Sequence, residues 1–146
     1  FLYFIEYRYV LYAHTHTTHL HMRLLTHNLM CCIKCQHYPL NVEATAVAPA
    51  EAPYDDDFIR RMLNRICYDY LVEAFEALRT SQPALQGKKA LPSKLEDVDL
   101  SEGSQDLRDI HFALNAFAVK DGFLKCSKCE TKFPIVDFVP NMLVEQ

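Results

Sequence analysis

The chain has 146 residues, which is enough for one ordinary domain or two small lobes. Half of the residues are apolar, and there are only 3 glycines and 7 prolines, so the composition excludes fibrous and disordered classes. Its formal net charge is −4 and its pI is near 5.9. Dedicated nucleic-acid binders usually carry a basic patch and a pI above about 9, so direct binding of RNA or DNA is not expected.

Residues 1–21 differ in character from the rest. Residues 1–12 (FLYFIEYRYVLY) are apolar and aromatic, but a membrane span needs about 20 apolar residues, and a secretory signal needs a basic start. Residues 14–21 form a histidine-rich tract, which could bind metal. We expect instead that residues 1–21 are a disordered or non-native extension and that the fold begins at Met22.

From residue 22 the predicted elements begin with a short helix or turn over 22–30. Residues 37–42 predict a strand, because Tyr38, Leu40 and Val42 alternate as a half-buried strand requires. Residues 44–53 (ATAVAPAEAP) are typical of a connector built from small residues.

Three helices are predicted in the middle of the chain. Three aspartates, 55–57, precede the first helix and are expected to cap its free N–H groups. The second helix follows and ends at Ser81, residues 83–104 are expected to form an exposed loop, and the third helix starts at about Gln105. Asp121-Gly122 then predicts a hairpin turn between short strands, and further strands are predicted at 131–137 and 142–144.

Two C-x-x-C motifs provide the strongest chemical signal. Cys32 and Cys35 form the first, and Cys126 and Cys129 form the second. Together they supply the four thiolates of a closed tetrahedral zinc site, which has no open position for a catalytic water. We therefore predict a structural Zn²⁺ ion. Cys31 could replace Cys32, and the alternatives to zinc are a redox dithiol or four structural cysteines.

The spacing of the two motifs predicts the architecture. A simple zinc ribbon separates its two motifs by about 15–20 residues, whereas residues 36–125 intervene here. We therefore predict an α+β fold: a small zinc-binding antiparallel sheet formed by both termini (22–43 and 119–146) with an inserted three-helix lobe (44–118). We predict no catalytic site, because no acid or nucleophile lies at a spacing from His27, His37 or His111 that is typical of a catalytic motif.

Apolar residues crowd the C-terminal segment 133–144. One face of a small sheet cannot bury so many, so some of them are expected to face a partner, with strand addition at a sheet edge as one mode.

Several segments together resemble the eukaryotic methyltransferase-activator subunits of the tRNA methyltransferase 112 type. They are residues 22–30 (MRLLTHNLM), the first C-x-x-C, the helix FIRRMLNRI, Phe133-Pro-Ile and Pro140-Asn-Met-Leu, and the resemblance covers about residues 22–145. It implies the same zinc-and-helix fold, the zinc ligands Cys32, Cys35, Cys126 and Cys129, and no enzymatic activity.

The resemblance also implies a role. Such subunits form heterodimers with AdoMet-dependent methyltransferases that modify tRNA, rRNA and a translation termination factor, in cytoplasm and nucleus. It implies contact with nucleic acid only through the partner and no contact with membranes. The alternative is a free-standing zinc-ribbon module that binds RNA directly.

A partner-binding surface follows from the same resemblance. Its residues are Leu24, Leu25, Asn28, Phe133, Ile135, Phe138, Val139, Pro140, Asn141, Met142 and Leu143. Phe138 stands where the family usually has glycine, which alone tolerates positive φ freely. Either the turn differs here, or Phe138 extends the apolar docking face.

Overall fold

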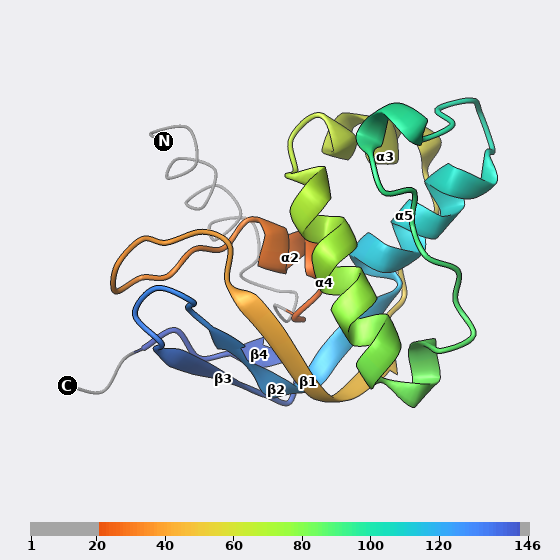
Figure 1. Cartoon of the computed structure of the whole chain (residues 1–146). Coiled ribbons are helices and arrows are strands. Elements are labelled where there is room, and N and C mark those ends of the chain that lie inside the picture. The colour runs from red at the N-terminus through yellow and green to blue at the C-terminus, as the bar shows by residue number, and fades with distance from the viewer. Residues whose placement is uncertain (1–20, 144–146) are drawn as a thin grey trace.

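The computed structural model describes residues 21–143. Within them a four-stranded antiparallel sheet, ordered β1-β2-β3-β4, lies below a group of helices (Figure 1). The strands are β1 (Asn41–Pro49), β2 (Phe117–Lys125), β3 (Lys132–Val136) and β4 (Val139–Pro140). The helices are α2 (Leu24–Asn28), α3 (Asp56–Leu63), α4 (Tyr68–Ser81) and α5 (Gln105–Asn115), with 3-10 turns η1 (Pro83–Leu85) and η2 (Leu95–Asp97). The predicted α+β class is confirmed.

The pairing of β1 with β2 joins distant parts of the chain, from Asn41 opposite Lys125 to Pro49 opposite Phe117. Gly122 lies inside β2 opposite Ala44, so the predicted hairpin turn at Asp121-Gly122 is wrong. A Cβ at Gly122 would lie 2.1 Å from the Glu43 carbonyl oxygen, so glycine is required by the close approach of β1. The predicted connector at 44–53 is also wrong in its first half, because residues 44–49 belong to β1.

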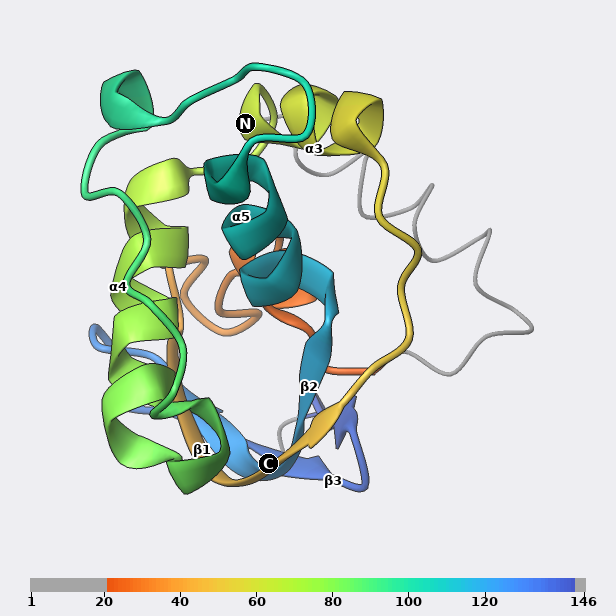
Figure 2. The same cartoon turned by 90° about the vertical axis from the view of Figure 1, so that its right-hand side faces the viewer.

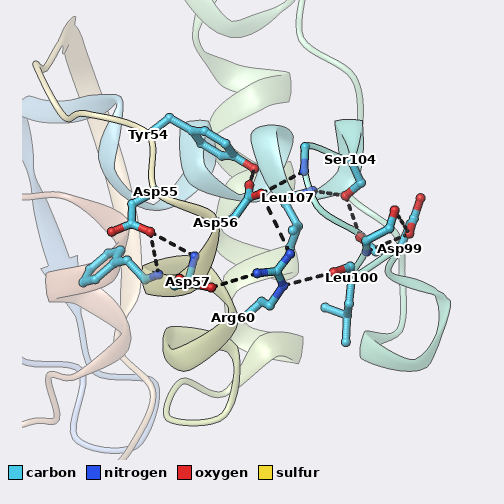
Figure 3. Close-up of polar contacts among 12 residues, drawn as sticks. Tyr54, Asp55, Asp56, Asp57, Arg60, Asp99, Leu100, Ser104 and Leu107 are labelled. Carbon is cyan, nitrogen blue, oxygen red and sulfur yellow. Dashed lines mark hydrogen bonds and ion pairs between the residues drawn. The ribbon is translucent and has the colours of Figure 1, made fainter.

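The three predicted helices are present with the expected N-terminal capping. The Asp55 carboxylate accepts from the N–H groups of Asp57 and Phe58 at 2.9 and 3.2 Å. Figure 3 shows how the start of α3 is tied to the loop before α5: Gly103 N–H donates to the Asp56 carboxylate at 2.8 Å, and Arg60 donates to the Leu100 carbonyl at 3.0 Å. These bonds hold α3 against the second half of the long loop.

The sheet and the helices share one hydrophobic core. Leu124 and Phe133 from the strands belong to the same buried cluster as Phe75 from α4 and Ile110 from α5. In Figure 2, α4 stands beside β1 and α5 leads directly into β2. The predicted domain boundaries at 43/44 and 118/119 fall inside β1 and β2, so the two strands extend from the sheet into the predicted helical lobe.

The C-terminal hairpin brings the two ends of the described chain together. Asp137 and Phe138 connect β3 to β4 with φ of 48° and 70°. Met22 N–H donates to the Phe138 carbonyl at 2.8 Å, and Val119 N–H donates to the Met22 carbonyl at 2.8 Å. The strand predicted at 142–144 instead lies at 139–140, and Val144 is outside the described residues.

The predicted extension 1–21 lies outside the described residues except for His21. The His21 ring stacks on Phe138 with ring centroids 4.9 Å apart. In the described residues 21–143, no helix combines the length and the apolar character that crossing a membrane requires.

Candidate functional site

The four predicted ligand cysteines meet at one end of the sheet. Their Sγ atoms all lie within 4.8 Å of one another. Cys32 Sγ is 3.6 Å from Cys129 Sγ, and Cys35 Sγ is 3.5 Å from Cys126 Sγ. A tetrahedral site with Zn–S bonds of about 2.3 Å has S···S edges of roughly 3.8 Å. The four sulfur atoms therefore fit one tetrahedral metal ion.

The two C-x-x-C turns have the same backbone hydrogen bonds. In the first, Cys32 N–H donates to the His37 carbonyl at 2.9 Å, and Gln36 N–H donates back to the Cys32 carbonyl at 2.8 Å. In the second, Cys126 N–H bonds the Thr131 carbonyl at 3.0 Å, and Glu130 N–H bonds the Cys126 carbonyl at 2.9 Å. The residue after each turn, Gln36 or Glu130, has φ near +60°.

This repeated geometry turns two thiols of each motif toward the opposite motif. Cys32 and Cys126 are fully buried, Cys35 is half-buried and Cys129 is exposed. Four protein ligands leave no open coordination position, so the site can support the fold but cannot activate a water molecule.

The electrostatics of the cluster favour a bound cation. The hydroxyl and backbone N–H of Thr131 lower the pKa of the Cys129 thiol to about 6, and the hydroxyl lies 3.1 Å from Sγ. For Cys35, a backbone hydrogen bond at His37 lowers the pKa, but burial and the other three sulfurs raise it to about 12. Four thiolates at these distances repel one another, so a divalent cation is needed to keep them all ionised.

The structure separates the alternatives for the cysteines. Cys32 faces the other three sulfurs and Cys31 does not belong to the group, so the order of ligands in the first motif is the predicted one. A thioredoxin-like dithiol needs its C-x-x-C at the start of a helix. Here both motifs lie in turns next to strands, so the redox alternative lacks its geometry. Cys67 precedes α4, away from the group.

Outside the cysteine cluster, three histidines and Asp56 have contacts within the fold. His27 Nε2–H donates to the Leu40 carbonyl at 2.5 Å, and His111 Nε2–H donates to the Ala52 carbonyl at 3.1 Å. His37 Nε2 lies 3.1 Å from Ser127 Oγ and so links the two C-x-x-C turns. The Tyr54 hydroxyl and the Gly103 N–H hold the pKa of Asp56 below its usual value.

Several residues of the predicted docking surface lie in the interior of the chain. Four of them have side chains that are about 1% exposed, namely Leu24, Asn28, Phe133 and Ile135. Leu25 is only partly buried, but it packs against the same core. In the described fold these four side chains fill the chain's own core or bond its backbone, and their predicted contact with a partner stays a prediction. Phe133 and Ile135 are buried because alternate residues of β3 face the core, and Leu24 and Asn28 are buried because they lie on the inner face of α2.

The other predicted docking residues reach the surface around β4. Val139 is 47% exposed and Leu143 is 83% exposed. Asn141 is exposed, while Phe138, Pro140 and Met142 are half-buried. Val136, which was not among the predicted docking residues, is 65% exposed on the same hairpin. Alternation with buried Phe133 and Ile135 places Val136 on the outer face, so period-two patterning could have identified it.

The fold and the cysteine cluster define an α+β protein in which two C-x-x-C motifs, separated by an inserted set of helices, come together and could hold one metal ion. No family model matches the chain. It is 33% identical over 129 residues to multifunctional methyltransferase subunit TRM112 homolog A of Arabidopsis thaliana, covering 86% of this chain and 98% of that protein. It is 32% identical over 126 residues to the TRM112-like protein of Caenorhabditis elegans, covering 84% and 95%.

The chain therefore belongs to the TRM112 family of multifunctional methyltransferase subunits. Among solved structures, it is similar to a chain in the E. cuniculi Mtq2–Trm112 complex, with a TM-score of 0.54 and 19% identity. The match covers 86% of this chain and 99% of that chain, and at this identity it shows the fold. These relatives do not favour the alternative of a free-standing RNA-binding module.

Proposed function

We propose that this chain is a non-catalytic subunit that binds, stabilises and activates AdoMet-dependent methyltransferases. Membership of the TRM112 family over 86% of the chain is the observation that carries the proposal. The E. cuniculi Mtq2–Trm112 complex is responsible for methylation of the eRF1 translation termination factor. By extension, the partners of this chain include methyltransferases for tRNA, for rRNA and for a termination factor.

The exposed apolar end of the sheet is the proposed docking surface. It consists of Val136, Phe138, Val139, Met142 and Leu143. Large apolar side chains gathered on one short hairpin are typical of a protein–protein contact. Among the described strands, β4 has a neighbour on one side only, so its other edge can accept a strand of the partner. A partner that binds only when folded gains stability from this contact by mass action.

Affinity purification of the full chain at moderate salt, with mass spectrometry of the proteins that accompany it, tests the role. We expect several AdoMet-dependent methyltransferases in near-stoichiometric amounts. Val136→Asp and Met142→Asp should each lose them while the chain stays folded, because a charge in a buried apolar contact is costly. Leu100→Asp, at a 50% exposed site on the helical side, is the matched control. Normal recovery with both hairpin variants would refute the surface.

We also propose that the metal of the cysteine site is zinc, since four thiolates in tetrahedral arrangement suit this ion and its role in structural sites. The mutual separations of the four Sγ atoms, all within 4.8 Å, support a single ion. Elemental analysis of the purified protein should give one zinc per chain.

Cytoplasm and nucleus are the proposed compartments, because thiolate zinc sites need reduced cysteines and the proposed partners act on RNA and on a translation factor. Fluorescence microscopy of the tagged full chain in the source cells tests this. Signal confined to a secretory compartment would contradict it.

A further inference from the structure

A depression of about 210 Å³ lies between α4, α5 and the loop that follows η1. Three cationic side chains line it: Lys88 and Lys89 from the loop and Arg108 from α5. Asp109 is the single carboxylate among its lining residues, and it accepts a hydrogen bond from Gln105 at 2.9 Å. The walls therefore carry a formal charge of +3 − 1 = +2, on a chain whose net charge is −4.

Among the described residues, none of these three cations forms an ion pair within 4.0 Å, and Arg108 acts on Asp56 at longer range, where its charge helps to lower the pKa of that carboxyl. The ion pairs among residues 21–143 involve Arg60 and Arg79, and none involves Lys88, Lys89 or Arg108. Glu76 on α4 is already bound by Arg79 at 2.6 and 3.0 Å. The same Arg79 donates to the Lys88 carbonyl at 3.4 Å, so it lies between Glu76 and the loop. The positive charge of the depression remains available to a ligand.

Aromatic rings hold two of the cations in place. Lys88 Nζ lies 4.3 Å from the centroid of the Phe112 ring, and the Arg108 guanidinium lies 5.4 Å from the centroid of the Tyr54 ring. The quadrupole of a ring attracts a cation without cancelling its charge, in contrast to a carboxylate. The backbone of Lys88 is fixed as well, since its N–H donates to the Leu85 carbonyl at 3.1 Å. The cations are thus positioned before any ligand arrives.

We propose that this depression binds backbone phosphates of the RNA that a methyltransferase partner holds. Lysine and arginine are the usual donors to phosphate oxygens, and three of them can contact about three phosphates. So few contacts bind RNA weakly on an acidic chain, but they add affinity once the methyltransferase has brought the RNA close. This inference rests on the proposed function, and it gives the chain a part in holding the substrate.

The location is compatible with docking at β4. In Figure 1 the loop after α4 lies on the right of the molecule and β3 lies on the left, and Figure 2 shows α4, α5 and that loop on the face turned toward the viewer. The residues of the depression and the proposed docking hairpin therefore come from different sides of the fold.

The test uses the complex of the full chain with an RNA methyltransferase recovered by the purification above, and a tRNA transcript as the probe. The triple variant Lys88→Gln, Lys89→Gln, Arg108→Gln should bind the same methyltransferase but raise KM for tRNA about ten-fold, with kcat unchanged. The slope of log affinity against log salt should fall by about 3, roughly one per lost phosphate contact. Lys94→Gln, in the same loop but outside the depression, is the matched control.

The complex with a termination-factor methyltransferase provides the second arm, and KM for the factor should not change. An equal rise in KM for the factor and the tRNA, or an unchanged salt slope for tRNA, would overturn the proposal. If the triple variant fails to fold, exposed Lys89→Gln alone should reduce the slope by about 1. Recovery of a methyltransferase with the unmodified chain tests the proposed function separately, so failure of one proposal is distinguishable from failure of the other.

Discussion

The side-chain amide of Asn28 forms two hydrogen bonds with the backbone of Cys67. Asn28 Nδ2 donates to the Cys67 carbonyl at 2.8 Å, and Cys67 N–H donates to Asn28 Oδ1 at 2.9 Å. The Tyr38 hydroxyl donates to the Asn28 carbonyl at 2.6 Å. Asn28 ends α2, close in sequence to the first C-x-x-C, whereas Cys67 precedes α4. Asn28 therefore connects the end of the fold that carries the cysteine cluster to the helices.

Asn28→Ala should destabilise the chain by about 2 kcal/mol, because it leaves two partly buried backbone groups of Cys67 without their partners. Urea unfolding, read as the shift in midpoint at constant slope, measures the loss. Asn64→Ala, at an exposed position after α3, should change the free energy of unfolding by less than about 0.5 kcal/mol. Similar midpoints for the two variants would show that the pair with Cys67 contributes little.

Phe138→Gly should raise stability and lower partner affinity. Phe138 has φ of 70°, and the left-handed region costs a residue with a Cβ about 1–2 kcal/mol. Glycine relieves this strain, so the free energy of unfolding should rise by about 1 kcal/mol. The ring, which stacks on His21 beside exposed Val139, is removed at the same time. We expect about ten-fold weaker binding of the methyltransferase by calorimetry.

Phe138→Ala is the matched control, because it removes the ring but keeps a Cβ at the strained position. It should weaken the complex as Phe138→Gly does, without the gain in stability. Unchanged affinity in both variants would mean that the ring belongs to the fold and not to the docking surface.

Cys129→Ser should release the metal and Cys31→Ser should not. Cys129 contributes one of the four clustered sulfurs, and Cys31 lies outside the group. Elemental analysis should fall well below one zinc per chain for Cys129→Ser, with a large drop in thermal midpoint, since metal binding contributes to folding directly. Full metal content in Cys129→Ser, or loss in Cys31→Ser, would contradict the ligand set.

The stability of the chain should fall as the pH drops below about 6.5. Burial lowers the pKa of His27 below its usual 6.5, although the hydrogen bond to the Leu40 carbonyl opposes this. Between the folded and the unfolded pKa, the unfolded chain binds more protons, so it gains stability relative to the folded chain. The contribution of His27 is complete above about pH 6.5 and is lost as pH falls toward the folded pKa.

Urea unfolding between pH 5 and 7.5, with zinc in excess, measures this dependence. His27→Gln keeps a donor for the Leu40 carbonyl and does not titrate in this range, so its curve should be flatter than that of the unmodified chain. Parallel curves would assign the acid sensitivity to other groups, the cysteines among them.

Local patterns predicted the parts of the fold that local physics determines. Helical periodicity placed α3, α4 and α5, and Asp55 caps α3 as expected. The equal spacing within the two C-x-x-C motifs predicted that the four cysteines cluster. This prediction did not depend on the distance between the motifs in the sequence, because one tetrahedral metal ion requires four ligands wherever they come from.

Three features of the fold depend on contacts between distant parts of the chain, and the local sequence did not predict them. The alanine-rich residues 44–49 have weak strand propensity, yet they form β1 because β2 pairs with them and α4 packs on them. Asp121-Gly122 has the composition of a turn, but glycine serves there for the close approach of β1. Burial of Asn28 depends on the backbone of Cys67, 39 residues later, which no local pattern contains.

The proposed metal centre draws two of its sulfurs from residues 32 and 35 and the other two from residues 126 and 129. During synthesis the first pair leaves the ribosome roughly 5–20 seconds before the second, at about 5–20 residues per second. A chain that stops early has two thiols and no complete site, and it also lacks most of β2, the partner of β1. Metal retention thus distinguishes finished chains from truncated ones, so incomplete products should be open to degradation before they can occupy a methyltransferase.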